Sequence, residues 1–286
     1  MAKNYSQTKE VNYNFRSDSL KKKIRNVQLG AINMEYLLTG FENKETILFV
    51  HGLGANLSQF ENQHQYFQDR YKTLSISLRG HGNTSSSSEL TESDFELSQF
   101  SNDIIMLLDT LGIGNVHYVG NSMGGNVGYE LMKVHSDRML SFTSYGTTSK
   151  LKKSGFTIGL MKFTYKLISM KTIGKLSGSA GVSEDSKTKI IEMISQAKKS
   201  TVLNLVPHLG NFDYLEVIKN SQVWAQIIRG DKDKEINKVI ESTIETFKVR
   251  GNFNLIDIEN TGHFANLDNP DLFNRTLETF LTGLDE

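Results

Sequence analysis

A serine stands between two glycines in residues 120–125, Gly-Asn-Ser-Met-Gly-Gly. The preceding residues 116–119 are typical of a buried strand, and residues 126–132 are typical of a helix. Gly-x-Ser-x-Gly at such a turn strains the serine backbone and presents the hydroxyl, while the following helix directs its positive end at developing negative charge. Ser122 is therefore our candidate nucleophile. On this motif alone, a glycine-rich turn with an incidental serine is the alternative.

A serine hydroxyl needs a general base at neutral pH, and the base needs a carboxylate that fixes its tautomer. Of seven histidines, His263 has the most suggestive setting, because it follows the last expected strand and precedes the final expected helix. Asp231 and Asp233 both come directly after an expected strand at 223–228. We favour Asp233 over Asp231 because of its reach along the loop.

An oxyanion hole requires two backbone N–H groups that point at one place. The residue after the nucleophile, Met123, supplies one of them. Leu53 is our candidate for the other, since it lies in a glycine-containing loop, residues 51–54, after an expected strand; an ordinary glycine-rich turn is the alternative there. We expect Gly52, Asn121 and Phe264, which neighbour these groups in the sequence, to contact the substrate.

Alternating strand and helix patterns position these residues. A period-two hairpin is expected at 24–29 and 32–38, and residues 253–258 suit an edge strand. Continuous apolar runs indicate strands buried on both faces, and helical spacing of apolar residues recurs between them. The pattern predicts an α/β fold with a mostly parallel sheet and helices on both faces. The apolar runs lie at 46–50, 74–78, 116–119, 140–145 and 223–228, and the helical patterns at 94–111, 236–249 and 270–281.

One long segment, residues 148–210, lacks a buried strand and carries helical patterns at 156–170 and 184–198. Its position favours a helical cap over the ligand crevice, with surface helices as the alternative. We therefore expect a flexible arm at 1–22, a core at 23–147 and 211–286, and a cap (lid) at 148–210. Four apolar side chains of the cap hint at an apolar pocket, although such residues more often simply pack: Phe156, Leu160, Phe163 and Met170.

Composition narrows the class of protein. The 286 residues carry 32 basic and 32 acidic side chains, so nothing in the net charge attracts nucleic acid or an anionic membrane. The absence of cysteine excludes thiolate metal sites and disulfides and fits a reducing cytoplasm, where we expect the protein. The polar N-terminus and the absence of an apolar run of about 18 residues predict no signal peptide and no integral membrane span. We expect no cofactor and no metal.

Four motifs occur in the order found in the α/β-hydrolase fold family, which this sequence resembles. They are the Gly-x-Ser-x-Gly turn, His51-Gly52-Leu53-Gly54, Arg79-Gly80-His81-Gly82, and Gly262-His263-Phe264 followed by Asn269-Pro270. The resemblance implies an α/β-hydrolase fold with a Ser122, Asp233, His263 triad. It also selects Asp233 over Asp231, because the acid in this family usually falls three residues after the glycine that ends its strand.

Departures from the family pattern leave the reaction open. Ser77 stands where relatives often have an aspartate that supports the following loop. Asn121 before the serine is similar to the meta-cleavage-product hydrolases, which break carbon–carbon bonds, but those usually have tryptophan after the histidine, where this chain has Phe264. A serine nucleophile argues against dehalogenases and epoxide hydrolases, which use aspartate.

Three functions follow as hypotheses. The first is a serine hydrolase (esterase-like) that cleaves an ester, lactone or thioester of a small, apolar substrate. The others are a carbon–carbon bond hydrolase and a non-catalytic small-molecule receptor on the same fold. The sequence does not determine the oligomeric state.

Overall fold

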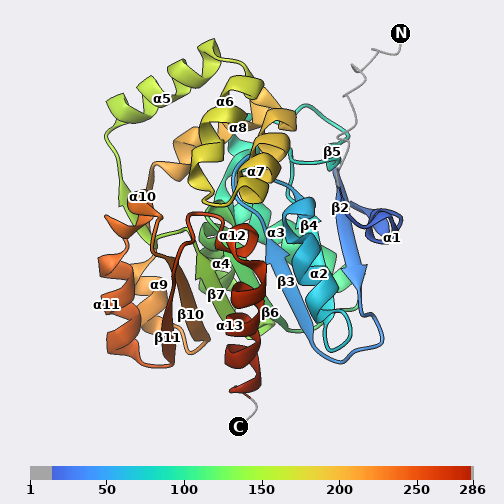
Figure 1. Ribbon diagram of the computed structural model, residues 1–286. Helices are drawn as coiled ribbons and strands as arrows, with labels where there is room; N and C mark the ends of the chain where they lie inside the picture. Colours follow the sequence, from blue (N-terminus) through green and yellow to red (C-terminus); the bar gives the residue numbers. More distant parts are fainter. Residues whose placement is uncertain (1–14, 285–286) are drawn as a thin grey trace.

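The computed structural model describes residues 15–284, and its main feature is a nine-stranded sheet with the strand order β1-β2-β4-β3-β6-β7-β10-β11, in which β5 pairs with β2 (Figure 1). β2 pairs antiparallel with β1, β4 and β5, and all other neighbours are parallel. The expected hairpin and edge strand are therefore confirmed. The strands are β1 Ile24–Leu29, β2 Ile32–Thr39, β3 Thr46–Val50, β4 Lys72–Ser77, β5 Ser85–Ser86, β6 Val116–Asn121, β7 Met139–Tyr145, β10 Trp224–Gly230 and β11 Phe253–Ile258.

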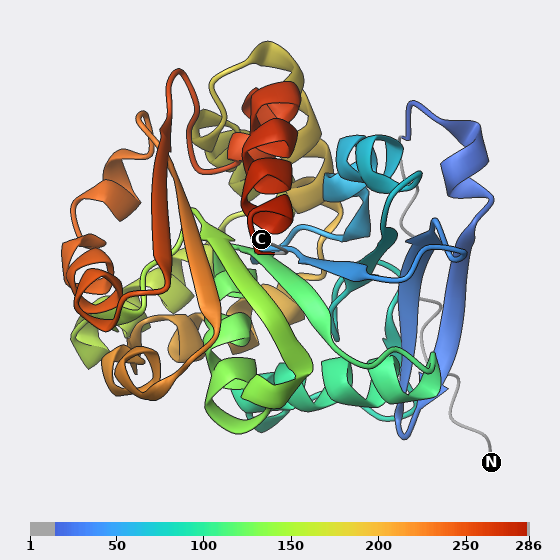
Figure 2. The same ribbon diagram turned by 90° about the horizontal axis from the view of Figure 1, so that it is seen from below.

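Helices cover both faces of the sheet, as Figure 2 shows with the red C-terminal helix on one side and the green helices on the other. β3 is buried on both faces of the sheet, which explains its run of apolar residues. Leu48 and Val50 pack into one core, and Ile47 and Phe49 pack into the other. The first core includes residues of α3, α4, α9 and α11, and the second includes residues of α2 and α13. These helices are α2 Glu61–Phe67, α3 Leu97–Thr110, α4 Met123–Val134, α9 Leu215–Asn220, α11 Glu241–Arg250 and α13 Pro270–Thr282.

The described part of the expected N-terminal arm is packed rather than loose. Helix α1, Asp18–Lys21, places Leu20 beside Phe15, Leu37 and Leu57 in a small buried cluster. The backbone N–H of Ser17 also donates to the Glu61 carboxylate at 2.7 Å. Because apolar burial and a hydrogen bond hold residues 15–22 on the core, the expectation of a flexible arm is wrong for them. Residues 1–14 of that arm lie outside the described residues.

The segment between β7 and β10 forms a helical insertion above the sheet (Figure 1). Two short antiparallel strands, β8 Lys150–Lys152 and β9 Asn211–Asp213, join its two ends. Ile173 and Ile190, from α6 and α7, form a buried cluster with Phe264 of the core. The helices of the insertion are α5 Gly155–Leu167, α6 Met170–Ser177, α7 Glu184–Gln196 and α8 Lys199–Leu205.

Three of the four apolar residues singled out in this insertion lie at the surface, so neither a pocket nor simple packing accounts for them. Phe156, Leu160 and Phe163 on α5 are exposed, by 82%, 54% and 58%. Met170 alone of the four packs against the buried cluster of α6 and α7. Helical spacing identified an apolar face correctly, but nothing among residues 15–284 covers it. No helix in this part of the chain is long and apolar enough to cross a membrane.

Candidate active site

Ser122 lies at the turn between β6 and α4 in a strained conformation, with φ 52° and ψ −119°. Its N–H donates to the carbonyl of Tyr145 on β7 at 3.0 Å. A Cβ at Gly120 would lie 2.6 Å from the backbone of Gly124, and a Cβ at Gly124 would lie 2.1 Å from the carbonyl oxygen of Val50. Both glycines are therefore required by close backbone approach, and they hold Ser122 as a nucleophile elbow would.

His263 and Asp233 are joined by a hydrogen bond of 2.8 Å between the imidazole Nδ1 and a carboxylate oxygen. Asp233 is buried and caps α10, Lys234–Asn237, by accepting from the N–H of Ile236. Asp231 turns elsewhere, to Lys232 at 2.6 Å and to the N–H of Thr261 at 3.2 Å. The structure therefore pairs His263 with Asp233 and not with Asp231.

Ser122, Asp233 and His263 all line one cavity of about 550 Å³. Gly52, Leu53 and Phe264, three further residues expected at the site, line it as well. The insertion supplies the rest of the apolar wall and two serines, none of which the sequence motifs indicated: Ser177, Ser179, Ala180, Val182 and Ile194. These residues bring the elbow and the histidine pair to a space that can hold a small molecule.

The two expected oxyanion donors lie near Ser122, the candidate nucleophile. Leu53 lines the cavity, and Met123 is the first residue of α4. Neither backbone N–H donates a hydrogen bond to another residue within 15–284. His51 fixes the loop, because its Nε2 accepts from the N–H of Leu78 at 3.0 Å and its Nδ1 donates to the carbonyl of Gly52 at 2.7 Å. Burial, followed by the neighbouring His81, holds the pKa of His51 well below its usual 6.5, so the ring is neutral in these roles.

Asn121 does not line the cavity, contrary to the expectation that it contacts substrate. Its side chain is fully buried and its Nδ2 donates to the backbone carbonyl of His263 at 2.9 Å. Its Oδ1 accepts from Gln59 Nε2 at 3.0 Å, and Asn266 Nδ2 in turn donates to the Gln59 carbonyl at 3.1 Å. The residue before the nucleophile thus holds the histidine loop. Gln59 and Asn266 carry no local sequence signal for this role, since only tertiary contact joins them.

The histidine loop is also tied to the insertion. The N–H of His263 donates to the carbonyl of Ala180 at 3.0 Å. Asp268 accepts from the N–H groups of Val182 at 2.7 Å and Gly262 at 2.8 Å, and so links the two segments. A movement of the insertion would therefore shift the backbone of His263 as well.

The turn after β4 is supported by a carboxylate from the neighbouring strand. Ser77 donates to Glu35 Oε2 at 2.8 Å, and the backbone and side chain of Asn83 donate to the same carboxylate, each at 3.0 Å. Glu35 faces Ser77 in the β2–β4 register. The family's aspartate in this turn is thus replaced by a serine that reaches the carboxylate of Glu35.

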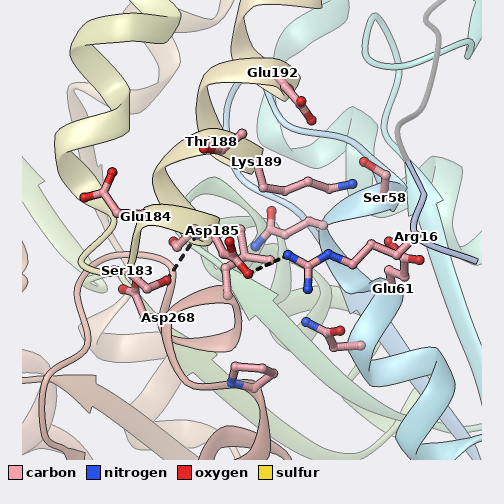
Figure 3. A pocket seen from close by; sticks show the side chains of 15 residues that line it. Arg16, Ser58, Glu61, Ser183, Glu184, Asp185, Thr188, Lys189, Glu192 and Asp268 are labelled. Atoms are coloured by element: carbon pink, nitrogen blue, oxygen red, sulfur yellow. Dashed lines mark hydrogen bonds and ion pairs between the residues drawn. The ribbon is translucent and has the colours of Figure 1, made fainter.

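A second cavity, of about 460 Å³, lies between the N-terminal segment and α7 (Figure 3). It shares no lining residue with the first cavity, and an Arg16–Asp185 ion pair of 2.6 Å lies within it. Its charged walls contain neither the elbow serine nor a histidine, so the candidate site is the cavity of Ser122. Within residues 15–284 no three His, Asp or Glu side chains are grouped so that they could hold a metal ion.

Comparison with known proteins agrees with this architecture. Residues 45–162 match the family described as alpha/beta hydrolase fold. The chain is 23% identical over 270 residues to 3-oxoadipate enol-lactonase 2 of Acinetobacter baylyi, covering 87% of this chain and 93% of the relative. It is 30% identical over 132 residues to 2-(acetamidomethylene)succinate hydrolase of Mesorhizobium japonicum, covering 44% and 45%. By their names both relatives are hydrolytic enzymes, which supports a hydrolase on this fold.

Solved structures show the same fold. A bromoperoxidase from Bacillus anthracis superposes with a TM-score of 0.80 at 21% identity, covering 91% of this chain and 99% of the other. A thermophilic esterase from Thermogutta terrifontis gives 0.79 at 17%, with coverage of 91% and 99%. An enol-lactonase from Burkholderia xenovorans gives 0.78 at 19%, with coverage of 90% and 100%. The mostly parallel sheet and these matches show that the chain has the α/β-hydrolase fold.

Proposed function

We propose that the protein is a serine hydrolase that cleaves a carboxylic ester, lactone or thioester of a small apolar substrate. One observation carries the proposal: the hydrogen-bonded pair of His263 and Asp233 lines the same cavity as the strained Ser122. A nucleophile, a base and a carboxylate that orients the base are the parts that acyl transfer requires.

In the proposed reaction Ser122 Oγ attacks the carbonyl carbon while Nε2 of His263 takes the hydroxyl proton. Asp233 stabilises the imidazolium through its hydrogen bond to Nδ1. The N–H groups of Leu53 and Met123 hold the oxyanion. When the C–O or C–S bond breaks, His263 returns the proton to the leaving group. It then removes a proton from the water that attacks the acyl-enzyme, and gives that proton to Ser122 Oγ as the acyl–oxygen bond breaks and the carboxylic acid leaves.

The cavity supports an apolar acyl group. Leu53 and Phe264 come from the core, and Val182 and Ile194 come from the insertion. We therefore propose that residues 148–210 act as a cap that completes the substrate site. A lactone is a good first substrate to test, because an enol-lactonase is among the relatives that match most of the chain.

Asn121, which also precedes the serine in the carbon–carbon hydrolases, can be explained here without carbon–carbon chemistry. Its side chain holds the His263 carbonyl and accepts from Gln59, a positioning task that any chemistry at Ser122 requires. A dienone substrate assayed beside esters and lactones separates the two reactions. Tight, stoichiometric binding of one of these compounds without product release would favour the receptor instead.

The decisive experiment compares Ser122→Ala with the unaltered protein. We expect p-nitrophenyl ester turnover and labelling by a fluorophosphonate probe to disappear, while the thermal melt shows a folded protein. Ser177→Ala is the matched control, because it removes a hydroxyl from the same cavity and should still be labelled. Turnover that survives in Ser122→Ala would rule out the proposed nucleophile.

A further inference from the structure

Helix α5 carries a stripe of exposed apolar side chains, here called the α5 stripe: Phe156, Leu160, Phe163 and Leu167. The spacing of four, three and four residues places all of them on one side of the helix. They are 82%, 54%, 58% and 68% exposed. In Figure 1, α5 forms the outer end of the insertion, away from the sheet. Four adjacent large apolar side chains left uncovered are unlike scattered surface residues and indicate a contact surface.

The other side of α5 is fixed to the protein. Ile158 lies against Gly210, where an added Cβ would come within 2.6 Å of the isoleucine. Lys199 on α8 donates to the carbonyls of Lys166 and Ile168 at 2.6 and 2.8 Å, which satisfies the end of the helix. The α5 stripe is thus presented to solvent by a helix that is anchored through its opposite face.

The segment of the chain that carries the α5 stripe has charged residues of one sign only. Residues 139–183 contain seven lysines and no acidic residue, although the whole chain is neutral. Lys150 pairs with Asp213 and Lys162 with Glu92. The other five lysines have no ion pair within residues 15–284: Lys152, Lys153, Lys166, Lys171 and Lys175. An apolar stripe on a segment that also carries unpaired lysines complements a surface that has an apolar interior and negative charges at its boundary.

We propose that α5 docks on the surface of an anionic lipid bilayer. The helix lies in the plane of the interface, with the α5 stripe among the acyl chains nearest the headgroups and the lysines at lipid phosphates. Its 13 residues measure about 20 Å, shorter than the roughly 30 Å of a hydrocarbon core, so it rests on the membrane and does not span it. The local lysine cluster thus provides the membrane attraction that the neutral net charge did not predict.

A second copy of the chain fits this face less well. A helix side about 20 Å long and 10 Å wide buries on the order of 200 Å² per partner, whereas a stable interface buries about 800 Å². The small area and the local excess of lysine therefore favour the lipid surface.

The proposal goes beyond the proposed function and is tested without enzyme activity. The full-length protein is sedimented with large vesicles of phosphatidylcholine alone, and with vesicles that contain phosphatidylglycerol at about one part in three. We expect binding to the anionic vesicles that weakens with salt, and little binding to the neutral ones. Ser122→Ala should bind equally well, so a failure of the proposed nucleophile leaves this test intact.

Variants test whether the α5 stripe makes the contact. Leu160→Ser with Phe163→Ser should lower the vesicle affinity about tenfold or more. Phe41→Ser and Val249→Ser are the controls, since these side chains are 67% and 88% exposed but lie outside the stripe, and they should bind normally. A thermal melt of each variant verifies folding.

A fluorescent reporter gives an independent reading. The chain has one tryptophan, so Trp224→Phe combined with Phe163→Trp places the only indole on the stripe, where anionic vesicles should shift its emission to the blue. Absence of binding to anionic vesicles, or binding that the double serine variant retains, would overturn the proposal. A lipid-free dimer that the same variant abolishes would also overturn it and would identify a second copy as the partner.

Discussion

Asn121 donates a hydrogen bond of 2.9 Å from its side-chain amide to the backbone carbonyl of His263, 142 residues along the chain. The residue before the candidate nucleophile thereby fixes the loop that carries the candidate base. Gln59 Nε2 donates a hydrogen bond to the oxygen of the same side-chain amide. The distance between Ser122 and His263 is set by this buried link as well as by the two turns on which they lie.

Replacing Asn121 by alanine should therefore impair the chemical step more than substrate binding. We expect kcat to fall about 10- to 100-fold with little change in KM, because a small displacement of the base is costly while the cavity wall is untouched. Steady-state kinetics on the best ester or lactone measures this. Asn126→Ala is the matched control: Asn126 is also buried, and it holds the Thr148 carbonyl at 2.9 Å, away from His263. An unchanged kcat in folded Asn121→Ala would contradict the positioning role.

The two aspartates that follow β10 give a paired prediction. Asp233→Asn leaves the shape of the site but removes the charge beside His263 Nδ1, and kcat should fall by about three to four orders of magnitude. Asp231→Asn should change kcat by less than about twofold, because its partner Lys232 is a surface residue and such pairs contribute little. Comparable losses in both variants would show that Asp233 has no special role.

The sequence predicts the position of a candidate catalytic residue on the fold when that residue directly follows a recognisable strand. Ser122, His263 and both aspartates follow strand ends, and apolar runs reveal such ends. Loop reach favoured Asp233 over Asp231, and the geometry gives the physical reason, because the turn sends one carboxylate inward and the other to Lys232. The family resemblance had indicated the same choice.

Long-range contacts mark where sequence reasoning stopped. Gln59 and Asn266 lie 207 residues apart, and no periodicity records that they meet beneath the site. The apolar face of α5 was visible as helical spacing, but a sequence pattern does not say whether another element covers a face. The spacing therefore left a pocket or simple packing as the roles of Phe156, whereas its side chain is 82% exposed.

The glycines of the elbow are expected to be essential for stability. A Cβ at Gly124 would lie 2.1 Å from the Val50 carbonyl oxygen, so Gly124→Ala has to displace β3 or α4. We expect the free energy of unfolding to drop by about 3 kcal/mol, measured by urea denaturation. Gly114→Ala is the control, since a Cβ there meets nothing within 4 Å and should leave stability unchanged or slightly raised. Equal stability of the two variants would show that the elbow can relax.

Buried histidines should make the fold sensitive to acid. Burial lowers the pKa of His64 to about 3 and that of His81 to about 4. Below about pH 6.5 the histidines of the unfolded chain bind protons, whereas the same rings in the folded protein stay neutral. Their contribution to the free energy of unfolding is therefore fully present above pH 6.5 and is lost as the pH falls toward 3 to 4.

His64 offers the cleanest test of this linkage, because its two nitrogens are held by the hydroxyls of Thr39 and Ser75, both at 2.9 Å, away from the candidate site. His64→Gln removes one such ring, and the slope of unfolding free energy against pH between about 6 and 4 should fall by roughly 1.4 kcal/mol per pH unit. Urea denaturation at several pH values measures the slope. Asn126→Ala serves as the comparison, since it changes a buried polar residue that does not titrate and should leave the slope as it is. If the slope stays unchanged in folded His64→Gln, the neutral state of that ring is not a source of the acid sensitivity.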